Sequence, residues 1–187
     1  MRARYALLLA PLALAGCGAP SGETLQKQEQ ARAAEVEKLE GWDRAFQPDV
    51  AVGAANQFGF RPTPYAPAGD GFASTGGPVT IANSFASKPN AVGFAARGAT
   101  AERVDTITFD LALTDAAGEA DALKRTADLI RDYLFQSKID AKPIHQKIAK
   151  GENGGGQLAG ANYAIERAGD RLTVTFHRSG ASAPANS

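Results

Sequence analysis

The feature that most constrains the fold is a two-residue alternation within residues 103–114. Apolar residues occupy every second position and small or polar residues stand between them: Ile107, Phe109, Leu111 and Leu113 alternate with Thr108, Asp110 and Ala112. Successive side chains of a β-strand point to opposite faces, so this pattern predicts a strand with one buried face. Residues 91–97 are the candidate partner strand, connected through residues 98–100.

A helical pattern follows this strand. Asp115 can cap a helix over about residues 116–137, because its side chain can accept hydrogen bonds from the first free backbone N–H groups. Apolar residues recur in this segment at helical spacing: Leu123, Ala127, Ile130 and Leu134. Such a stripe buries one face of a helix, so the pattern predicts a helix packed on a sheet.

The last third of the predicted domain adds a short helix and a hairpin. Pro143 suits the first turn of the short helix, with Ile144 and Ile148 on one face. The glycine-rich run 151–156 ends that helix, and we expect it to be a mobile loop. Residues 161–167 and 171–178 then read as two strands joined by a tight turn.

The predicted order is therefore strand, strand, helix, short helix, strand, strand. Hairpins that flank a helix indicate an antiparallel sheet with helices packed on one face, so the predicted fold class is α+β. This core, residues 91–178, is less than half of the 187-residue chain. A core of that size buries a modest fraction of its surface, so we expect the preceding segment to add coverage.

That preceding segment, residues 41–90, is rich in proline, glycine and aromatic residues, and holds seven of the fourteen aromatic side chains. Its prolines argue against long helices, so we expect irregular coil and short strands, among them residues 72–74 and 85–87. Disordered segments are poor in aromatic residues, which favours packing on the domain over the alternative of a partner-binding arm. The predicted folding unit is residues 41–178, and the tail 179–187 is expected to be disordered.

Composition excludes several classes of function. Lys and Arg number 20, as do Asp and Glu, whereas nucleic-acid binding needs a surplus of positive charge. The hydrophobic content of 44% is too high for a disordered protein. The one cysteine excludes an intramolecular disulfide and a zinc site built from several cysteines.

The N-terminus has the pattern of a secretory signal. A basic start is followed by an uncharged stretch that is too short to span a membrane. It ends in Leu14-Ala15-Gly16-Cys17, which resembles the lipobox of bacterial lipoproteins. The resemblance implies that residues 1–16 are a signal peptide and that the Cys17 thiol receives a diacylglycerol. The alternative is ordinary secretion after an Ala-x-Ala site, with Cys17 a free thiol.

The resemblance also implies a location. Two or more acyl chains anchor a protein stably to a bilayer. In the lipoprotein family an Asp directly after the cysteine tends to retain the protein at the inner membrane, and here that position holds Gly18. We therefore expect a protein in the cell envelope, anchored to the outer membrane and facing the periplasm; the inner membrane and a soluble periplasmic form are the alternatives.

Residues 17–40 are expected to form the lipidated cysteine, a short spacer and a helical stalk. The part from Glu23 to Glu40 has no glycine or proline and is rich in good helix formers. Its few apolar residues do not sustain a coiled-coil repeat. We interpret it as a solvated helix, with a partner-binding or self-associating helix as the alternative.

Candidate functional residues form two groups. The first is the polar face of the last strand, Thr173, Thr175 and His177. The second is a local basic patch at the short helix, which is either a solvated helix face or a contact with an acidic partner or an anionic glycan: Lys138, Lys142, His145, Lys147 and Lys150. No G-x-S-x-G, S-x-x-K, H-E-x-x-H or phosphate-loop motif is present, so the sequence assigns no catalytic residue, metal ligand or cofactor.

These observations favour a membrane-anchored binding or assembly module, with a protein partner in the envelope, over an enzyme. The alternatives are an envelope hydrolase that uses His145 or His177, and a structural tether. A hydrolase predicts a pocket where a histidine meets a carboxylate and a hydroxyl at about 3 Å. A binding module predicts separated histidines and an exposed aromatic patch or an unpaired sheet edge.

Overall fold

The structure is a computed structural model in which residues 22–180 are described. The predicted lipidation site, Cys17, and the tail from residue 181 lie outside that range. The chain divides into two compact units, Met1–Glu35 and Val36–Ser187. Helix α1, Gly22–Lys38, has a high content of good helix formers and almost entirely exposed side chains where they are described.

The second unit is built on a seven-stranded sheet in which every neighbouring pair is antiparallel. The spatial order is β1-β2-β3-β4-β7-β6-β5. The strands are β1 Ala66–Ala68, β2 Gly71–Ala82, β3 Asn90–Gly98, β4 Thr106–Ala112, β5 Gly154–Leu158, β6 Ala161–Ala168 and β7 Arg171–His177. Central strand β4 pairs with β7, which follows it by about 60 residues, so the two predicted hairpins join into one sheet.

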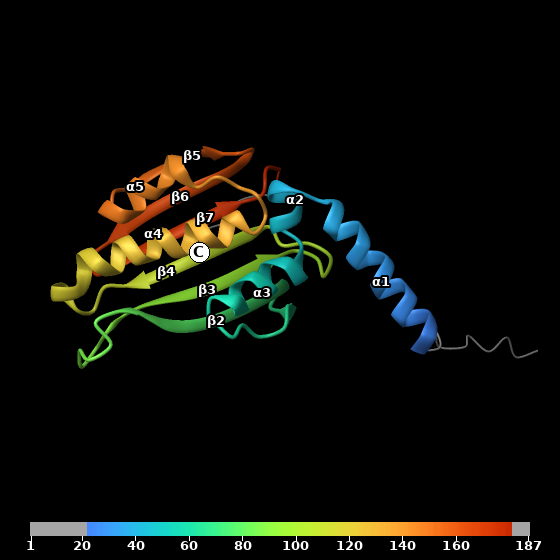
Figure 1. Ribbon diagram of the computed structural model, residues 1–187, viewed down its shortest axis with the longest axis horizontal. Helices are drawn as coiled ribbons and strands as arrows, with labels where there is room; N and C mark the ends of the chain where they lie inside the picture. The colour runs from blue at the N-terminus through green and yellow to red at the C-terminus, as the bar shows by residue number, and fades with distance from the viewer. Residues whose placement is uncertain (1–21, 181–187) are drawn as a thin grey trace, which may run out of the picture. The chain divides into compact units, whose positions relative to one another are not determined.

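The helices of this unit pack on one face of the sheet (Figure 1). They are α2 Gly41–Ala45, α3 Pro48–Gln57, the single 3-10 turn η1 Ala116–Gly118, α4 Glu119–Phe135 and α5 Lys142–Lys150. The predicted α+β class, with an antiparallel sheet and helices on one face, is confirmed. Asp115 caps as expected: its carboxylate accepts a hydrogen bond from the Ala117 N–H, at the start of the 3-10 turn that leads into α4.

The core lies between the sheet and the helices. On β4 the buried residues are Ile107, Phe109 and Leu111, as their alternation predicts. Phe109 is the centre of an aromatic cluster, with ring centroids 5.0 Å from Tyr133 of α4 and 5.7 Å from Phe94 of β3. The opposite face of the sheet carries short polar side chains and no covering helix of this unit.

Two expectations about local structure are wrong. Residues 41–57 form helices α2 and α3 rather than coil, because Pro48 stands in the first turn of α3, where a proline costs no hydrogen bond, and the next proline is Pro62. Residues 72–74 lie in a strand as expected, but β2 is twelve residues long, and residues 85–87 lie in the connection that follows it.

The glycine-rich run is also not a loop throughout, since Gly154 begins edge strand β5. Two of its glycines are accepted there for different reasons. The stem of Lys147 covers Gly154, and the Tyr163 ring lies 3.5 Å from where a Cβ of Gly156 would stand. Gly154 thus leaves room for Lys147, whereas Gly156 is favoured by its φ of +150° rather than by crowding, and composition alone reveals neither reason.

Two glycines of β3 should respond oppositely to alanine. A Cβ on Gly93 would meet no atom closer than 3.8 Å, whereas one on Gly98 would stand 2.2 Å from the Arg103 carbonyl oxygen. We expect Gly93→Ala to raise the free energy of unfolding by about 0.5–1 kcal/mol, since glycine loses the most backbone freedom on folding. Gly98→Ala should lower it by about 1–3 kcal/mol through the steric clash. Urea unfolding followed by tryptophan fluorescence measures both, and equal shifts of the two variants would contradict this account.

Candidate functional site

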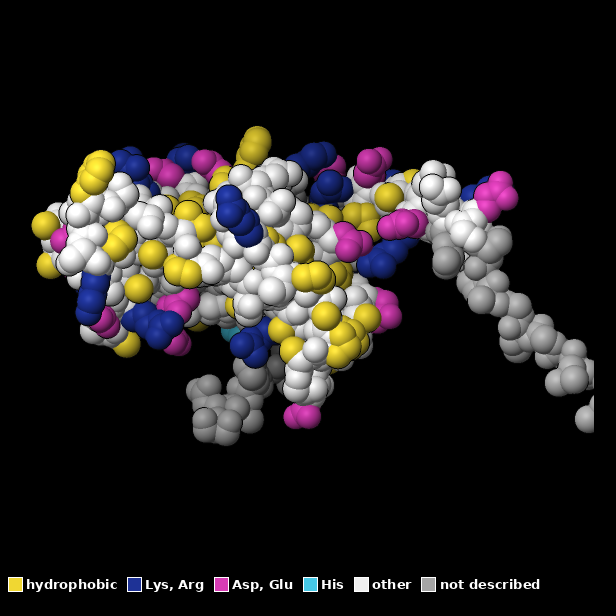
Figure 2. Space-filling view, turned by 90° about the horizontal axis from the view of Figure 1, so that it is seen from below, with side chains coloured by type: hydrophobic (Ala, Val, Ile, Leu, Met, Phe, Trp, Pro, Cys, Tyr) yellow, Lys and Arg dark blue, Asp and Glu magenta, His cyan; other side chains and the backbone are white. Residues whose placement is uncertain are grey.

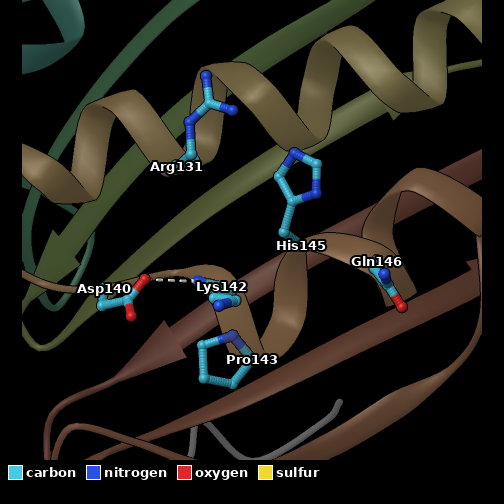
Figure 3. Close-up of a pocket in the computed structure, with 6 residues that line it drawn as sticks. All are labelled: Arg131, Asp140, Lys142, Pro143, His145 and Gln146. Carbon is cyan, nitrogen blue, oxygen red and sulfur yellow. Dashed lines mark hydrogen bonds between the residues drawn. The ribbon is translucent and has the colours of Figure 1, made fainter.

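A hollow in the described part of the second unit lies between α4 and α5. Its volume is about 810 Å³, and it is lined by Arg131, Asp140, Lys142, Pro143, His145 and Gln146 (Figure 3). A second hollow of about 290 Å³ shares Arg131 and Asp140 with it and adds Phe135, Lys138, Ile139 and Ala141. We call the two together the α4–α5 groove.

The sequence between the helices sets this groove. Lys138 has a φ of +60°, and the Ile139 N–H bonds back to the Leu134 carbonyl, so α4 ends in a tight left-handed turn. Asp140 then accepts a hydrogen bond from the Lys142 N–H at the start of α5. Buried Ile144 and Ile148 hold α5 against the domain. As a result, α4 and α5 lie side by side with the α4–α5 groove between their exposed faces.

A hydrogen-bonded cluster joins the two helices across the groove. The His145 ring is directed from α5 toward α4 (Figure 3), and its Nε2 lies 2.9 Å from Asp128 Oδ1. Asp128 also accepts hydrogen bonds from Arg131 and Lys124. The hydrogen bond with His145, helped by these two cations, holds the pKa of Asp128 below its ordinary value. The negative charge of Asp128 is therefore already compensated by Lys124, Arg131 and the hydrogen bond with His145.

The groove also exposes apolar surface beside a cation. The Phe135 side chain is 75% exposed although it lies in the last turn of α4. Pro143 and the chain around Ile139 and Ala141 continue this apolar surface into the groove. Within residues 22–180, Lys142 has no ion pair with a carboxylate. A large apolar side chain next to a cation is a common feature of surfaces that bind a partner.

The structure separates the residues of the predicted basic patch. Lys142 and His145 line the groove, but Lys147 runs along Gly154 of β5 and Lys150 stands 3.7 Å from Glu152. The four residues share a short helix but point in different directions around it. Together with Lys138, which lines the second hollow, the groove thus contains three of the five residues that the sequence singles out.

The second predicted group lies on the far side of the sheet from the helices. Thr173, Thr175 and His177 alternate on β7 with the buried Leu172, Val174 and Phe176. His177 Nδ1 lies 3.2 Å from Thr106 Oγ1 on β4. Thr173 Oγ1 donates to Asp110, whose carboxylate is also paired with Arg171. Thr173 and His177 thus already have side-chain partners on the neighbouring strand β4.

The two histidines therefore lie on opposite sides of the sheet, in different chemical settings. His145 meets a carboxylate, but the residues lining its hollow carry no hydroxyl or thiol. His177 meets a hydroxyl, and two nearby carboxylates, Asp105 and Asp110, are paired with arginines. Among residues 22–180 no group of three His, Cys, Asp or Glu is placed to hold a metal ion.

Sequence reasoning missed Phe135, Arg131 and Asp140 as members of the site. One signal was present for Phe135: it follows Leu134, the last residue of the buried stripe, and so falls on the solvent side of the helix. Arg131 and Asp140 carry no such signal, because surface charges on and after a helix are ordinary.

On the side shown in Figure 2, Lys and Arg are interspersed with Asp and Glu, and hydrophobic side chains are scattered. No helix within residues 22–180 has both the length and the apolar character to cross a bilayer.

Comparisons of the chain with protein-family models, with curated proteins and with solved structures found no match.

Proposed function

We propose that this chain is a lipid-anchored protein of the bacterial cell envelope whose α+β domain binds a partner protein through the α4–α5 groove. The observation that carries the proposal is Phe135: a phenylalanine that is 75% exposed on a well-packed helix, where it lines the smaller of the two hollows that form the groove. Burying such a side chain against a partner gains about 1.5–3 kcal/mol, which favours association.

The anchoring part of the proposal rests on the sequence. The basic start, the apolar stretch and the small residues before Cys17 together resemble a lipobox, and Gly18 favours the outer membrane. A diacylglycerol with a further acyl chain holds a protein at a bilayer without help from the rest of the surface. The balanced charge of the chain agrees with this, because lipid attachment needs no basic face.

The arrangement of the histidines supports binding over catalysis. A histidine hydrolase needs a base and a nucleophile within hydrogen-bond reach, and the hollow at His145 supplies the histidine and carboxylate without a hydroxyl. The contact of His145 with Asp128 instead ties α5 to α4 and so stabilises the shape of the groove. A hydrolase that activates water at His145 stays the second candidate, and a purely structural tether the third.

Site-specific photo-crosslinking in cells tests the proposal. Benzoylphenylalanine replaces Phe135 in one strain and Phe85 in another; Phe85 is fully exposed but lies outside the groove, which makes it the matched control. We expect discrete protein adducts from position 135 and none of the same mass from position 85. Adding Lys142→Glu should weaken the adducts at least severalfold.

Two results would contradict the proposal. One is the absence of any adduct at position 135 in cells in which the protein is at its normal level. The other is an identical set of adducts from both positions, because that pattern reports exposure alone. Substrate cleavage by the purified protein that is lost in His145→Gln would favour the hydrolase.

A further inference from the structure

Resting on the proposed function, we infer that the occupant of the α4–α5 groove is an acidic protein segment that carries a large apolar side chain. The apolar side chain enters the groove beside Phe135, and its neighbouring carboxylates face Lys142. The basis for this assignment is the charge of α5, the compensation of the carboxylates in the groove, and the apolar surface at Phe135.

The charge of α5 has one sign. Its nine residues include Lys142, Lys147 and Lys150, and no Asp or Glu. Lys142 is at the groove and, within the described residues, has no carboxylate partner. A cation left without a partner on the rim of a binding surface attracts an opposite charge and favours a partner that supplies it.

The carboxylates in and beside the groove do not oppose an acidic partner strongly. Asp128 is compensated by His145, Lys124 and Arg131. Asp140 accepts a hydrogen bond from the Lys142 N–H and keeps its negative charge. Among the residues that line the two hollows, the cations Arg131, Lys138 and Lys142 outnumber this one carboxylate, which favours an acidic segment over a basic one.

The apolar surface calls for an anchor side chain rather than charge alone. Phe135, Pro143 and the chain at Ile139 give the groove an apolar wall, and a hollow of about 810 Å³ has room for more than one side chain. Binding surfaces of this kind obtain most of their affinity from a few large buried side chains, with the charged rim setting specificity.

A lipid surface fits these observations less well. Attachment to anionic headgroups needs a cluster of about four to eight unpaired Lys or Arg. Of the three cations that line the groove, Arg131 is paired with Asp128 and Asp132, and Lys138 with Glu40. A single unpaired lysine beside an apolar hollow suits one segment of a partner protein better than a membrane.

Selection from a random peptide library tests this inference. The full protein, extracted from its membrane in mild detergent, is immobilised and used to select displayed twelve-residue peptides. We expect the enriched peptides to combine net negative charge with one or two Phe, Leu, Ile or Trp residues. Their binding should fall at least tenfold in Lys142→Glu and in Phe135→Ser, and should not change in the matched control Phe85→Ser.

Three outcomes would overturn the inference: enrichment of neutral or basic peptides, no enrichment, or acidic peptides whose binding ignores Lys142→Glu and Phe135→Ser. Displacement of the selected peptides by phosphatidylglycerol bicelles, but not by phosphatidylcholine bicelles, would assign the groove to lipid headgroups instead. If crosslinking at position 135 succeeds while the selected peptides lack acidic character, the proposed function stands and only the class of partner fails.

Discussion

Replacement of Trp42 by alanine is expected to lower the free energy of unfolding by about 3–5 kcal/mol, out of a total that is about 5–15 kcal/mol for a typical domain. Trp42 is 8% exposed and stacks on Phe46 of the next turn, with ring centroids 5.1 Å apart. It also packs in a tilted arrangement against Phe176 of β7, with ring centroids 5.2 Å apart. Its indole Nε1 donates a 2.6 Å hydrogen bond to the Leu158 carbonyl at the end of β5. One side chain thus connects α2 with β7 and the β5–β6 turn.

The measurement is urea unfolding followed by circular dichroism, because the variant loses the single tryptophan of the chain. Trp42→Phe is the matched control: it keeps an aromatic ring and removes the hydrogen bond, so it should cost about 1–3 kcal/mol, less than alanine. A loss below 1 kcal/mol in Trp42→Ala would mean that residues 41–57 are not an integral part of the folded domain.

Replacement of Cys17 by alanine is expected to move the protein from the membrane fraction almost completely into the soluble envelope fraction. The reason is that the acyl chains proposed for Cys17 supply the anchoring free energy, roughly 0.8 kcal/mol for each buried CH₂ group. Within residues 22–180 no helix could replace that anchor by spanning a bilayer. Cell fractionation with mass spectrometry of the N-terminal peptide measures the change.

The matched control is Gly18→Ala, which keeps the cysteine and should leave the protein in the membrane fraction. A Cys17→Ala variant that stays with the membrane, or an unmodified Cys17 in the parent protein, would contradict the anchor. Neither result would bear on the groove, because the groove is formed entirely by residues 131–146.

Local patterns predicted the central elements well. The alternation at residues 103–114 corresponds to β4, and the stripe that ends at Leu134 corresponds to α4. The turn between β6 and β7 was also placed correctly, with Gly169 in the left-handed conformation that tight turns require. Each of these signals is contained in a few consecutive residues, which is why the sequence carries it.

The errors arose where an element depends on a distant neighbour. Gly154 and Gly156 have no strand preference of their own, and they lie in β5 because β6 pairs with them and Lys147 and Tyr163 cover them. Pro48 was read as a helix breaker, whereas its position in the first turn makes it a helix start. The position of Phe135 just after the buried stripe indicates an exposed side chain, but only the position of α5 shows that this side chain lies at a groove.

By itself, the sequence determined the α+β class, the one-sided sheet and the main helix, because periodicity along the chain encodes which side of each element is buried. The lipid anchor is a further prediction of the sequence, and it concerns residues outside the described range. Only the tertiary structure decided that β4 and β7 are neighbours, that the histidines lie on opposite sides of the sheet, and that α4 and α5 enclose a groove beside Phe135. Those relations depend on contacts between residues far apart in the chain, and no local pattern specifies them.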